Sequence, residues 1–347
     1  MLLGLGRIGC GYDSDLPFLP DEPLSSARIL THARALVCHP GYVLTAGIDP
    51  NPEARQRFEN LYGIKTFPDL AAWSNDTVDC GLDLAVVAVG PEHQKVLVES
   101  LCLLAAPRML LLEKPVSISL EESRALKAYC SNKNDLKVAV NYIRRYLPAV
   151  KEWQSRLMSG ELGTLIYGQI TYGKGLLSNA SHFVNLAEAW LGPLKFGHLI
   201  DKGSACLGFD WEASLELLAS HHDDASLLVR SVGSSGMRAG ELDLWFTGGR
   251  LSWQNNGEFI AFWPRRTPVK YATGEIDSHD CLTAEPELTP TGIDQYQMEV
   301  MSELHLSLLD PTRSPLICSL KEGLHTIETL LSAYTDNTGT KKSISSD

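Results

Sequence analysis

A lysine stands directly behind one of the buried strands that the sequence predicts. The apolar run Met109–Leu112 continues into Glu113-Lys114-Pro115, which places the charged pair at the carboxyl edge of a sheet, where open α/β folds bind ligands. An ammonium group beside a bound cofactor can bind a substrate hydroxyl and relay its proton. The alternative is a surface ion pair at a strand end. Lys114 is therefore a candidate catalytic group, and Lys114 and Glu113 are both candidate cofactor contacts.

A glycine-rich turn follows the first apolar run. Gly4-Leu5-Gly6-Arg7-Ile8-Gly9 has the spacing G-x-G-x-x-G. Glycine permits a tight turn here and lets backbone amides approach a pyrophosphate. Glycine-rich turns are common, but this one comes immediately after a short predicted strand. The pattern therefore predicts a dinucleotide site, with cofactor contacts at Gly4, Gly6, Arg7, Ile8 and Gly9.

An acidic residue ends the second predicted strand, where a dinucleotide fold binds the ribose hydroxyls. Asp49 lies 40 residues after Gly9, whereas the usual distance is about 20. A proline-rich insertion over Gly11–Leu24, either a surface loop or a flap over the site, delays the next helix to Ser26–Cys38. A carboxylate repels a 2′-phosphate, so the sequence favours NAD over NADP. Alternatively, Asp49 caps the helix that begins near Pro52.

Short apolar strands alternate with helical patterns over residues 1–142. Continuous apolar strands are typical of a parallel sheet covered on both faces, and the alternation predicts a doubly wound α/β domain. One of its helices, Ser119–Cys130, begins with the capping box Ser119-Leu120-Glu121-Glu122. The strands are expected at Met1–Gly4, Tyr42–Ile48, Leu82–Val89, Met109–Leu112 and Lys137–Asn141.

Residues 143–337 have the pattern of a second, α+β domain. Tight turns such as Asn255-Asn256-Gly257 connect antiparallel neighbours, so we expect an open, mainly antiparallel sheet. The helices Ile293–Leu309 and Leu320–Thr335 end this domain, and residues 338–347 form a polar tail. The strands are expected at Leu165–Tyr172, Ala213–Ser220, Ser226–Val232, Glu241–Thr247, Arg250–Gln254 and Glu258–Trp263.

One face of this second sheet is expected to be apolar and free. The alternation over Leu242–Phe246 and Leu251–Trp253 supplies the apolar side chains. A one-layer sheet with such a face is an aggregation hazard unless it is covered. We therefore expect a homodimer or homotetramer that forms through this sheet.

Composition excludes several classes of protein. The formal charge is −12, which disfavours binding to nucleic acid or to an anionic membrane surface. The eight cysteines include no CxxC pair, so neither a zinc nor a redox motif is indicated and a reducing, cytoplasmic location is expected. No metal site is predicted, because adjacent strand residues such as His221-His222-Asp223-Asp224 point to opposite faces and fit a polar turn better.

Several motifs, in order along the chain, resemble those of the Gfo/Idh/MocA oxidoreductases. The resemblance covers at least residues 1–192. It implies a Rossmann domain that binds a nicotinamide dinucleotide, and an open-sheet domain that often mediates oligomers. It also implies oxidation or reduction of an alcohol of a sugar, cyclitol or sugar nucleotide, with the closest similarity to members from bacterial surface-polysaccharide biosynthesis. The motifs are Gly4–Gly9, Val89-Gly90-Pro91-Glu92-His93, Glu113-Lys114-Pro115, Asn141-Tyr142-Ile143-Arg144-Arg145, Ser159-Gly160-Glu161-Leu162-Gly163, Ser181-His182-Phe183-Val184-Asn185 and Trp190-Leu191-Gly192.

The resemblance implies that Lys114 and His182 form the catalytic pair and that His93 lies near the cofactor. Two positions depart from the family pattern. Ser178 stands where many members have an acid, four residues before the histidine, and Asn185 stands in place of the aspartate of H-x-x-D. Loss of these carboxylates weakens a direct copy of the family's acid–base relay.

Four polar residues are candidate substrate ligands. Lys174 and Arg145 are suited to holding a carboxylate or phosphate, or are ordinary surface charges. Asn179 and Asn185 can orient substrate hydroxyls or fix the tautomer of an imidazole. His182 itself has the alternative of being a helix N-terminal residue that only packs at the domain junction.

The predicted function is an NAD-dependent oxidoreductase that transfers a hydride between nicotinamide and a secondary alcohol or ketone of a carbohydrate. One alternative is a non-catalytic regulator of the same fold that senses the dinucleotide. The lost carboxylates favour this alternative, whereas retention of Lys114 and His182 disfavours it. Another alternative is a glycosidase with a transient NAD redox cycle.

Overall fold

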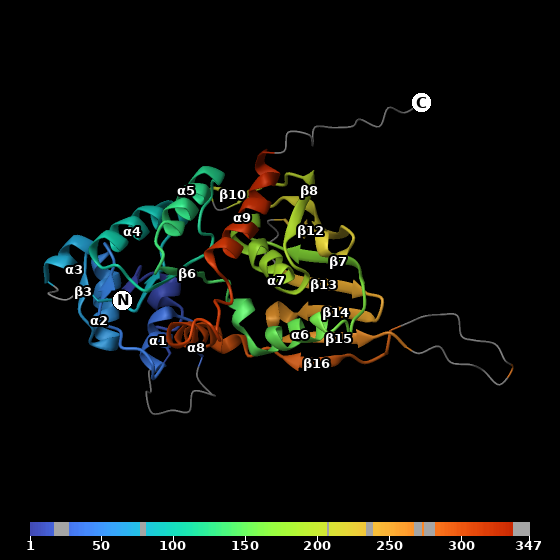
Figure 1. The fold of residues 1–347 in the computed structure, drawn as a ribbon, viewed down its shortest axis with the longest axis horizontal. Helices are drawn as coiled ribbons and strands as arrows, with labels where there is room; N and C mark the ends of the chain where they lie inside the picture. The colour runs from blue at the N-terminus through green and yellow to red at the C-terminus, as the bar shows by residue number, and fades with distance from the viewer. Residues whose placement is uncertain are drawn as a thin grey trace. The chain divides into compact units, whose positions relative to one another are not determined.

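The chain divides into two compact units (Figure 1). The computed structural model describes residues 1–16, 28–76, 81–206, 208–233, 239–266, 273 and 282–335. Unit 1 comprises Met1–Leu147 and Gly292–Ile327, and unit 2 comprises Pro148–Thr291 and Glu328–Asp347. The later part of the expected insertion, residues 17–24, and the expected polar tail lie outside the described residues.

Unit 1 is built on a six-stranded parallel sheet. Its strand order is β3-β2-β1-β4-β5-β6, the order of a doubly wound dinucleotide-binding fold, in which β1 and β4 flank the point where the direction of winding reverses. The predicted Rossmann fold class is confirmed. The strands are β1 (Leu2–Leu3), β2 (Gly47–Ile48), β3 (Thr66–Phe67), β4 (Leu84–Val87), β5 (Met109–Leu112) and β6 (Lys137–Val140).

The helices of unit 1 begin at recognisable caps. The backbone N–H of Glu122 donates to Ser119 Oγ at 3.1 Å at the start of α5, and the N–H of Ser319 donates to Glu322 Oε2 at 2.9 Å at the start of α9. Among the described residues, no helix is both long and apolar enough to cross a membrane. The helices are α1 (His32–Cys38), α2 (Pro52–Tyr62), α3 (Leu70–Asp76), α4 (Pro91–Leu104), α5 (Leu120–Ser131), α8 (Tyr296–Leu309) and the start of α9 (Leu320–Thr335).

Helix α8 completes unit 1 rather than the second domain in which the sequence places it. It contacts α1 and the 3₁₀ turn Ile143–Tyr146. Met301 and Leu304 are buried in the core of unit 1, and the N–H of Val140 donates to Cys318 O at 2.9 Å. Unit 1 is therefore assembled from two separate stretches of the chain, residues 1–147 and 292–327.

Unit 2 contains an eight-stranded mixed sheet of order β16-β15-β14-β13-β7-β12-β11-β8. Every pair is antiparallel except β7 with β12, which are parallel. The predicted class, an α+β domain with a mainly antiparallel sheet, is confirmed. The strands of the sheet are β7 (Leu165–Tyr172), β8 (Leu194–Asp201), β11 (Ser214–Ala219), β12 (Ala225–Ser231), β13 (Gly240–Phe246), β14 (Gly249–Gln254), β15 (Phe259–Pro264) and β16 (Glu287–Pro290).

The apolar face of this sheet is covered within unit 2. Helix α6 (Pro148–Met158) packs Trp153 on Phe262, with ring centroids 5.3 Å apart, and helix α7 (Ser181–Leu191) contacts β13. The prediction that this alternation leaves an apolar face free is therefore wrong. The buried side chains are Leu242, Leu244, Phe246, Leu251 and Trp253.

Candidate active site

A cavity of about 570 Å³ opens at the carboxyl ends of the central strands of unit 1. Gly4 and Gly6 line it from the loop after β1, Asp49 from the end of β2, and His93 from α4. This is the edge at which open α/β sheets bind their ligands. The cavity therefore brings together four of the cofactor contacts expected from the sequence.

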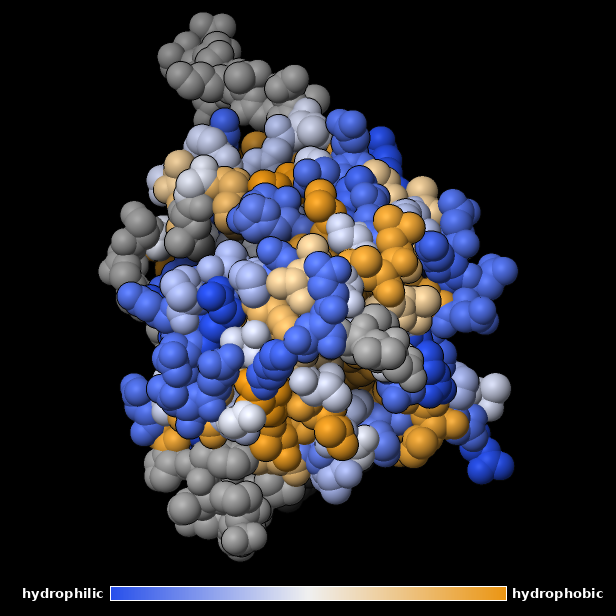
Figure 2. Space-filling model, turned by 90° about the vertical axis from the view of Figure 1, so that its left-hand side faces the viewer, coloured by the Kyte–Doolittle hydropathy of each residue, from blue (hydrophilic) through white to orange (hydrophobic). Residues whose placement is uncertain are grey.

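Apolar side chains make up much of the remaining lining of this cavity. They include Leu70, Val96 and Leu97, and Val96 is 62% exposed. Figure 2 shows the side on which α2 and α3 lie in Figure 1, where apolar side chains gather in patches among polar ones. A mostly apolar cavity with a few placed polar groups is the usual form of a cofactor site.

The glycine loop is shaped by close packing on one side and open space on the other. Gly4 has a φ of 89°, and a Cβ there would collide with the carbonyl oxygen of Ala88. A Cβ on Gly9 would collide with the carbonyl oxygen of Gly4, whereas no atom lies within 4 Å of a Cβ built on Gly6. Gly6 therefore presents bare backbone toward the cavity. The chain then enters a π-helical turn, Arg7–Gly11.

Asp49 is bound to the glycine loop. Its Oδ2 accepts a hydrogen bond from Leu5 N at 2.7 Å and its Oδ1 accepts one from Asn51 N at 2.8 Å. The cap of α2 is Asn51, whose Oδ1 accepts from Glu53 N at 2.9 Å. The carboxylate of Asp49 thus supports the loop and lines the cavity, and a neighbouring residue caps the helix.

Glu113 lies in a buried cluster of polar side chains rather than on the surface. Its Oε1 is 2.7 Å from His32 Nε2 and accepts from Asn141 Nδ2 at 2.6 Å. Burial alone would raise the pKa of Glu113, but the hydrogen bonds and charge of His32, with Asn141 and Lys114, lower it overall. Lys114, the next residue, is half-buried. The Glu113 carboxylate is therefore bound to protein groups. The sequence predicted Glu113 only as a cofactor contact and did not predict these partners.

In unit 2, a distorted segment precedes the helix that carries His182. Lys174 and Gly175 have φ values of 70° and 95°. Residues other than glycine rarely adopt a positive φ. Residues Leu176–Ala180 then form a π-helical turn, and α7 begins at Ser181. Left-handed residues and π-helical turns are enriched at functional sites.

Two buried carboxylates hold this segment by its backbone. Asp210 accepts from Leu177 N at 3.0 Å and from Ser178 N at 2.7 Å, and Glu212 accepts from Lys174 N at 2.7 Å. Their exposures are 1% and 3%. Burial and the charge of Asp210 raise the pKa of Tyr334, whose hydroxyl donates to Asp210 Oδ1 at 2.9 Å.

Sequence reasoning missed Asp210 and Glu212, although a signal existed. In Asp210-Trp211-Glu212 the two acids are two residues apart and, in an extended chain, point to the same side. Asp210 and Trp211 form the short strand β10, which pairs with β9 (Ala205–Cys206). His32 was missed as well, because its partner Glu113 is 81 residues away.

The structure gives the proposed substrate ligands different surroundings. Arg145 is 6% exposed and donates from Nη1 to Glu322 Oε1 at 2.8 Å in unit 1. Asn179 donates from Nδ2 to Gly173 O at 2.6 Å, and so also supports the distorted segment. Asn185 is fully buried, and Lys174 is exposed. Of these four side chains, Lys174 is the most accessible to a ligand.

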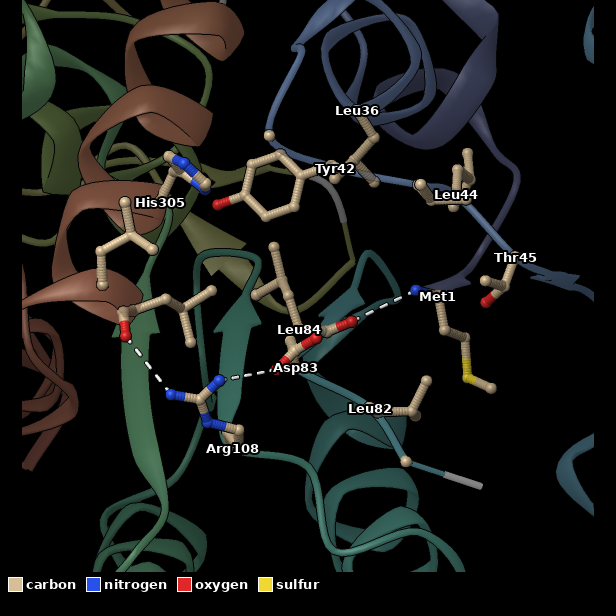
Figure 3. A pocket seen from close by; sticks show the side chains of 15 residues that line it. Met1, Leu36, Tyr42, Leu44, Thr45, Leu82, Asp83, Leu84, Arg108 and His305 are labelled. Atoms are coloured by element: carbon tan, nitrogen blue, oxygen red, sulfur yellow. Dashed lines mark hydrogen bonds and ion pairs between the residues drawn. The ribbon is translucent and has the colours of Figure 1, made fainter. Parts of the chain in front are cut away.

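A second cavity, of about 400 Å³, lies at the amino ends of the same parallel strands (Figure 3). Several of its polar groups are bonded to the protein. Arg108 pairs with Asp83 at 2.7 Å, and the hydroxyl of Tyr42 donates to Met301 O at 3.0 Å. We assign no ligand to it. Within the described residues, no group of three or more histidine, cysteine or acidic side chains is arranged to hold a metal ion.

Comparisons with known proteins agree with this geometry. Residues 29–142 match the model of the Gfo/Idh/MocA family, described as an oxidoreductase family with an NAD-binding Rossmann fold. No curated protein matches the sequence.

Solved structures share the fold over nearly the whole chain. An oxidoreductase from Agrobacterium radiobacter in complex with NAD⁺, L-tartaric acid and magnesium has a TM-score of 0.69 at 16% identity, covering 98% of this chain and 96% of its own. The WlbA dehydrogenase from Bordetella pertussis in complex with NADH and UDP-GlcNAcA has a TM-score of 0.72 at 15% identity, covering 96% and 93%. A 3-ketoreductase from Actinomadura kijaniata in complex with NADP and TDP-benzene has a TM-score of 0.68 at 14% identity, covering 96% of each chain.

The family match contains Val89-Gly90-Pro91-Glu92-His93 and Glu113-Lys114-Pro115, two of the motifs on which the resemblance rests. The resemblance is therefore confirmed. It rests on the match of residues 29–142 to the family model and on the fold shared with the solved structures.

Proposed function

We propose that this protein is an NAD-dependent oxidoreductase that transfers a hydride between nicotinamide and a secondary alcohol or ketone of a sugar, cyclitol or sugar nucleotide. The observation that carries the proposal is the cavity at the carboxyl edge of the parallel sheet, lined by Gly4, Gly6, Asp49 and His93. Bare backbone at Gly6 suits a pyrophosphate, and Asp49 suits a ribose diol. When bound, the dinucleotide supplies the hydride acceptor or donor.

We assign the acid–base roles in the proposed hydride transfer to two side chains. When an alcohol loses hydride, its hydroxyl also loses a proton, and negative charge develops on that oxygen. We assign Lys114 as the cation that binds this hydroxyl and relays its proton, because a fixed cation stabilises the developing charge more than the ground state. We assign His182, from unit 2, as the general base in oxidation. Lys174 is the proposed anchor for an acidic or phosphorylated substrate.

The substrate class draws on the structural relatives. Two of them were solved with a sugar nucleotide or a nucleotide analogue, UDP-GlcNAcA and TDP-benzene. The test begins with mass spectrometry of any ligand that the purified protein carries, followed by a panel of sugars and sugar nucleotides monitored at the absorbance of NADH. Net NADH formation supports the proposal. Dinucleotide binding without turnover would instead indicate a regulator, and hydrolysis without net NADH a glycosidase.

Cofactor preference is expected to depend on Asp49. Its carboxylate can bind a ribose diol but repels a 2′-phosphate, so NAD should bind more tightly than NADP. Asp49→Ala should narrow the difference in Kd by about tenfold, the effect of removing one like charge worth roughly 1.4 kcal/mol. Calorimetric titration with both dinucleotides measures this, with Asp76→Ala as a control because Asp76 pairs with Lys65 on the surface. Equal affinities in the unmodified protein would refute the assignment.

We propose further that the protein is a homodimer or homotetramer through the sheet of unit 2. The face opposite the buried one carries Trp245, which is 38% exposed, and Arg250, which lies 5.4 Å from the Trp245 ring and 4.9 Å from the Trp263 ring. Exposed aromatic residues with arginine are typical of protein interfaces. Light scattering should give a multiple of 38.1 kDa.

A charge on this face should reduce the assembly. Trp245→Glu is expected to lower the mass measured by light scattering, whereas Leu103→Glu should not, because Leu103 is an 80% exposed residue of α4 in unit 1. A monomer across micromolar concentrations of the unmodified protein would contradict the proposal.

A further inference from the structure

A group of buried polar side chains surrounds Glu113 in unit 1. His32 and Gln94 are fully buried, and Glu113 and Asn141 are 8% and 1% exposed. They come from separate elements: His32 opens α1, Gln94 lies on α4, and Asn141 follows β6. Buried polar side chains are retained when they are mutually bonded, and they then fix one local geometry.

The group holds the turn that carries Lys114 from several directions. Glu113 Oε1 takes the bonds from His32 and Asn141, and Glu113 Oε2 accepts from the backbone N–H of Lys114 at 3.2 Å. Gln94 Nε2 donates to Glu113 O at 2.5 Å and to Pro115 O at 3.3 Å. The backbone on both sides of Lys114 is thereby fixed.

Although burial opposes it, the hydrogen bonds of His32 and Asn141 lower the pKa of Glu113 and favour its ionised form. The Asn141 amide nitrogen can only donate, and an ionised carboxylate can only accept. His32 Nε2, 2.7 Å from the same oxygen, must then carry a proton and donate too. The phenol of Tyr296, on α8, also interacts electrostatically with Glu113. Its hydroxyl, however, donates a hydrogen bond to Leu30 O at 2.8 Å.

The position of His32 is itself fixed. Thr31 caps α1 by accepting from Arg34 N at 3.3 Å. Buried Asp13 accepts from Thr31 N at 3.0 Å and from Thr31 Oγ1 at 2.7 Å. The residue after the cap, His32, is therefore held against Glu113 by contacts on the chain before it.

We propose that His32 is a positioning residue which, through Glu113, keeps a buried negative charge beside Lys114 and fixes the Lys114 backbone. The catalytic part of this role rests on the proposed function. Glu113 and Lys114 attract each other electrostatically, so an ionised Glu113 holds the lysine as a cation at the strand edge. A neutral Glu113 would lose this attraction to the Lys114 ammonium group. His32 thus acts on the reaction without touching substrate.

Loss of the His32 donor should change the titration of Glu113. In the native fold the pKa of Glu113 is lowered, so the stabilisation from its charge is present above the unfolded pKa and is lost only as pH falls through the folded value. Without His32, desolvation dominates and the pKa of Glu113 should rise above that of the unfolded chain. Stability should then decrease as pH rises from the unfolded value through the folded one.

Two substitutions separate the donor from the ring. His32→Gln offers an amide N–H near the place of Nε2, and His32→Leu offers none, while both remove the imidazole. We expect the urea midpoint of His32→Leu to fall relative to that of His32→Gln as pH rises from 5 to 7. The double variant His32→Leu/Glu113→Gln should lose this dependence. Parallel midpoints of the two single variants across this range would overturn the proposal.

Activity provides the second readout. His32→Leu should lower kcat about tenfold, the effect of roughly one pKa unit of lost interaction, with little change in the Kd of NAD. The acid limb of its pH–rate profile should move to higher pH, and His32→Gln should restore both kcat and the limb. A fall in kcat shared equally by both variants, without movement of the limb, would overturn the positioning role. The stability experiment needs no turnover, so an inactive unmodified protein would contradict the proposed function alone.

Discussion

Replacing Lys114 with methionine is expected to lower kcat by roughly 10²-fold or more, the usual effect of removing one aimed electrostatic group. Methionine keeps an unbranched side chain, one atom shorter than that of lysine, and removes the charge and the donors. The lysine contacts the reacting oxygen in the proposed mechanism, whereas the cavity is lined by Gly4, Gly6 and Asp49. The affinity for NAD should therefore stay close to normal. Steady-state kinetics and calorimetry measure the two quantities.

Matched variants make this result interpretable. Lys133→Met removes an exposed cation that lies over the ring of Tyr129, and it should leave kcat unchanged. His182→Ala should reduce kcat less than Lys114→Met does, and should flatten the lower limb of the pH–rate profile because the proposed general base is lost. Full turnover by Lys114→Met on the true substrate would show that another residue, or no residue, carries the chemistry.

Replacing Asp210 with asparagine is expected to destabilise the protein by about 3 kcal/mol, since it removes a buried charge that several donors share. Asp210 accepts from Leu177 N, Ser178 N, Trp211 N and the Tyr334 hydroxyl. An amide of the same shape turns one acceptor into a donor, so at least one of these buried donors would face another donor. Urea denaturation measures the loss.

The control for Asp210 is another aspartate of unit 2. Asp223 is exposed and has a φ of 52°, a conformation that asparagine tolerates, so Asp223→Asn should change stability by less than about 0.5 kcal/mol. Asp210→Asn should also lower kcat, because Asp210 holds the segment between Lys174 and His182. Unchanged stability would mean that the backbone amides of this segment find other acceptors.

Elements with long apolar runs could be predicted from the sequence. Strands β5 and β7 and helix α9 begin and end where the sequence predicts. A continuous apolar run marks β5, and a capping box marks α9. Strand β8 was not predicted. It contains Lys195, Gly197 and His198, and register shifts in its pairing with β11 break the alternation.

Short and polar strands, and the order of the strands, could not be predicted. Strand β3 has two residues and edge strand β16 is polar, so neither has a periodic pattern. The parallel pairing of β7 with β12 joins segments separated by helix α7 and the four strands β8 to β11. Local turn signals predict only hairpins between neighbours in the chain.

The candidate site was predictable in part for a related reason. The glycine loop and Asp49 are neighbours of strand ends, and parallel strands bring their carboxyl ends to one edge. The hydrogen bonds that hold these segments in place join residues far apart in the sequence. His32 with Glu113, and Asp210 with Ser178, join residues 81 and 32 positions apart. Such pairs are set by the tertiary fold, so composition and periodicity contain no trace of them.

The return of the chain to unit 1 has a consequence for synthesis on the ribosome. Domains generally fold as units, starting from the N-terminus as it emerges. Here Met301 and Leu304 of α8 belong to the core of unit 1, and the carbonyl oxygen of Cys318 accepts a hydrogen bond from Val140 N of β6. Apolar surface of the parallel sheet that α8 covers in the folded protein therefore stays exposed while residues 148–291 are translated. We expect nascent unit 1 to depend on chaperones until α8 is released, whereas the sheet of unit 2 can pair once β16 has emerged.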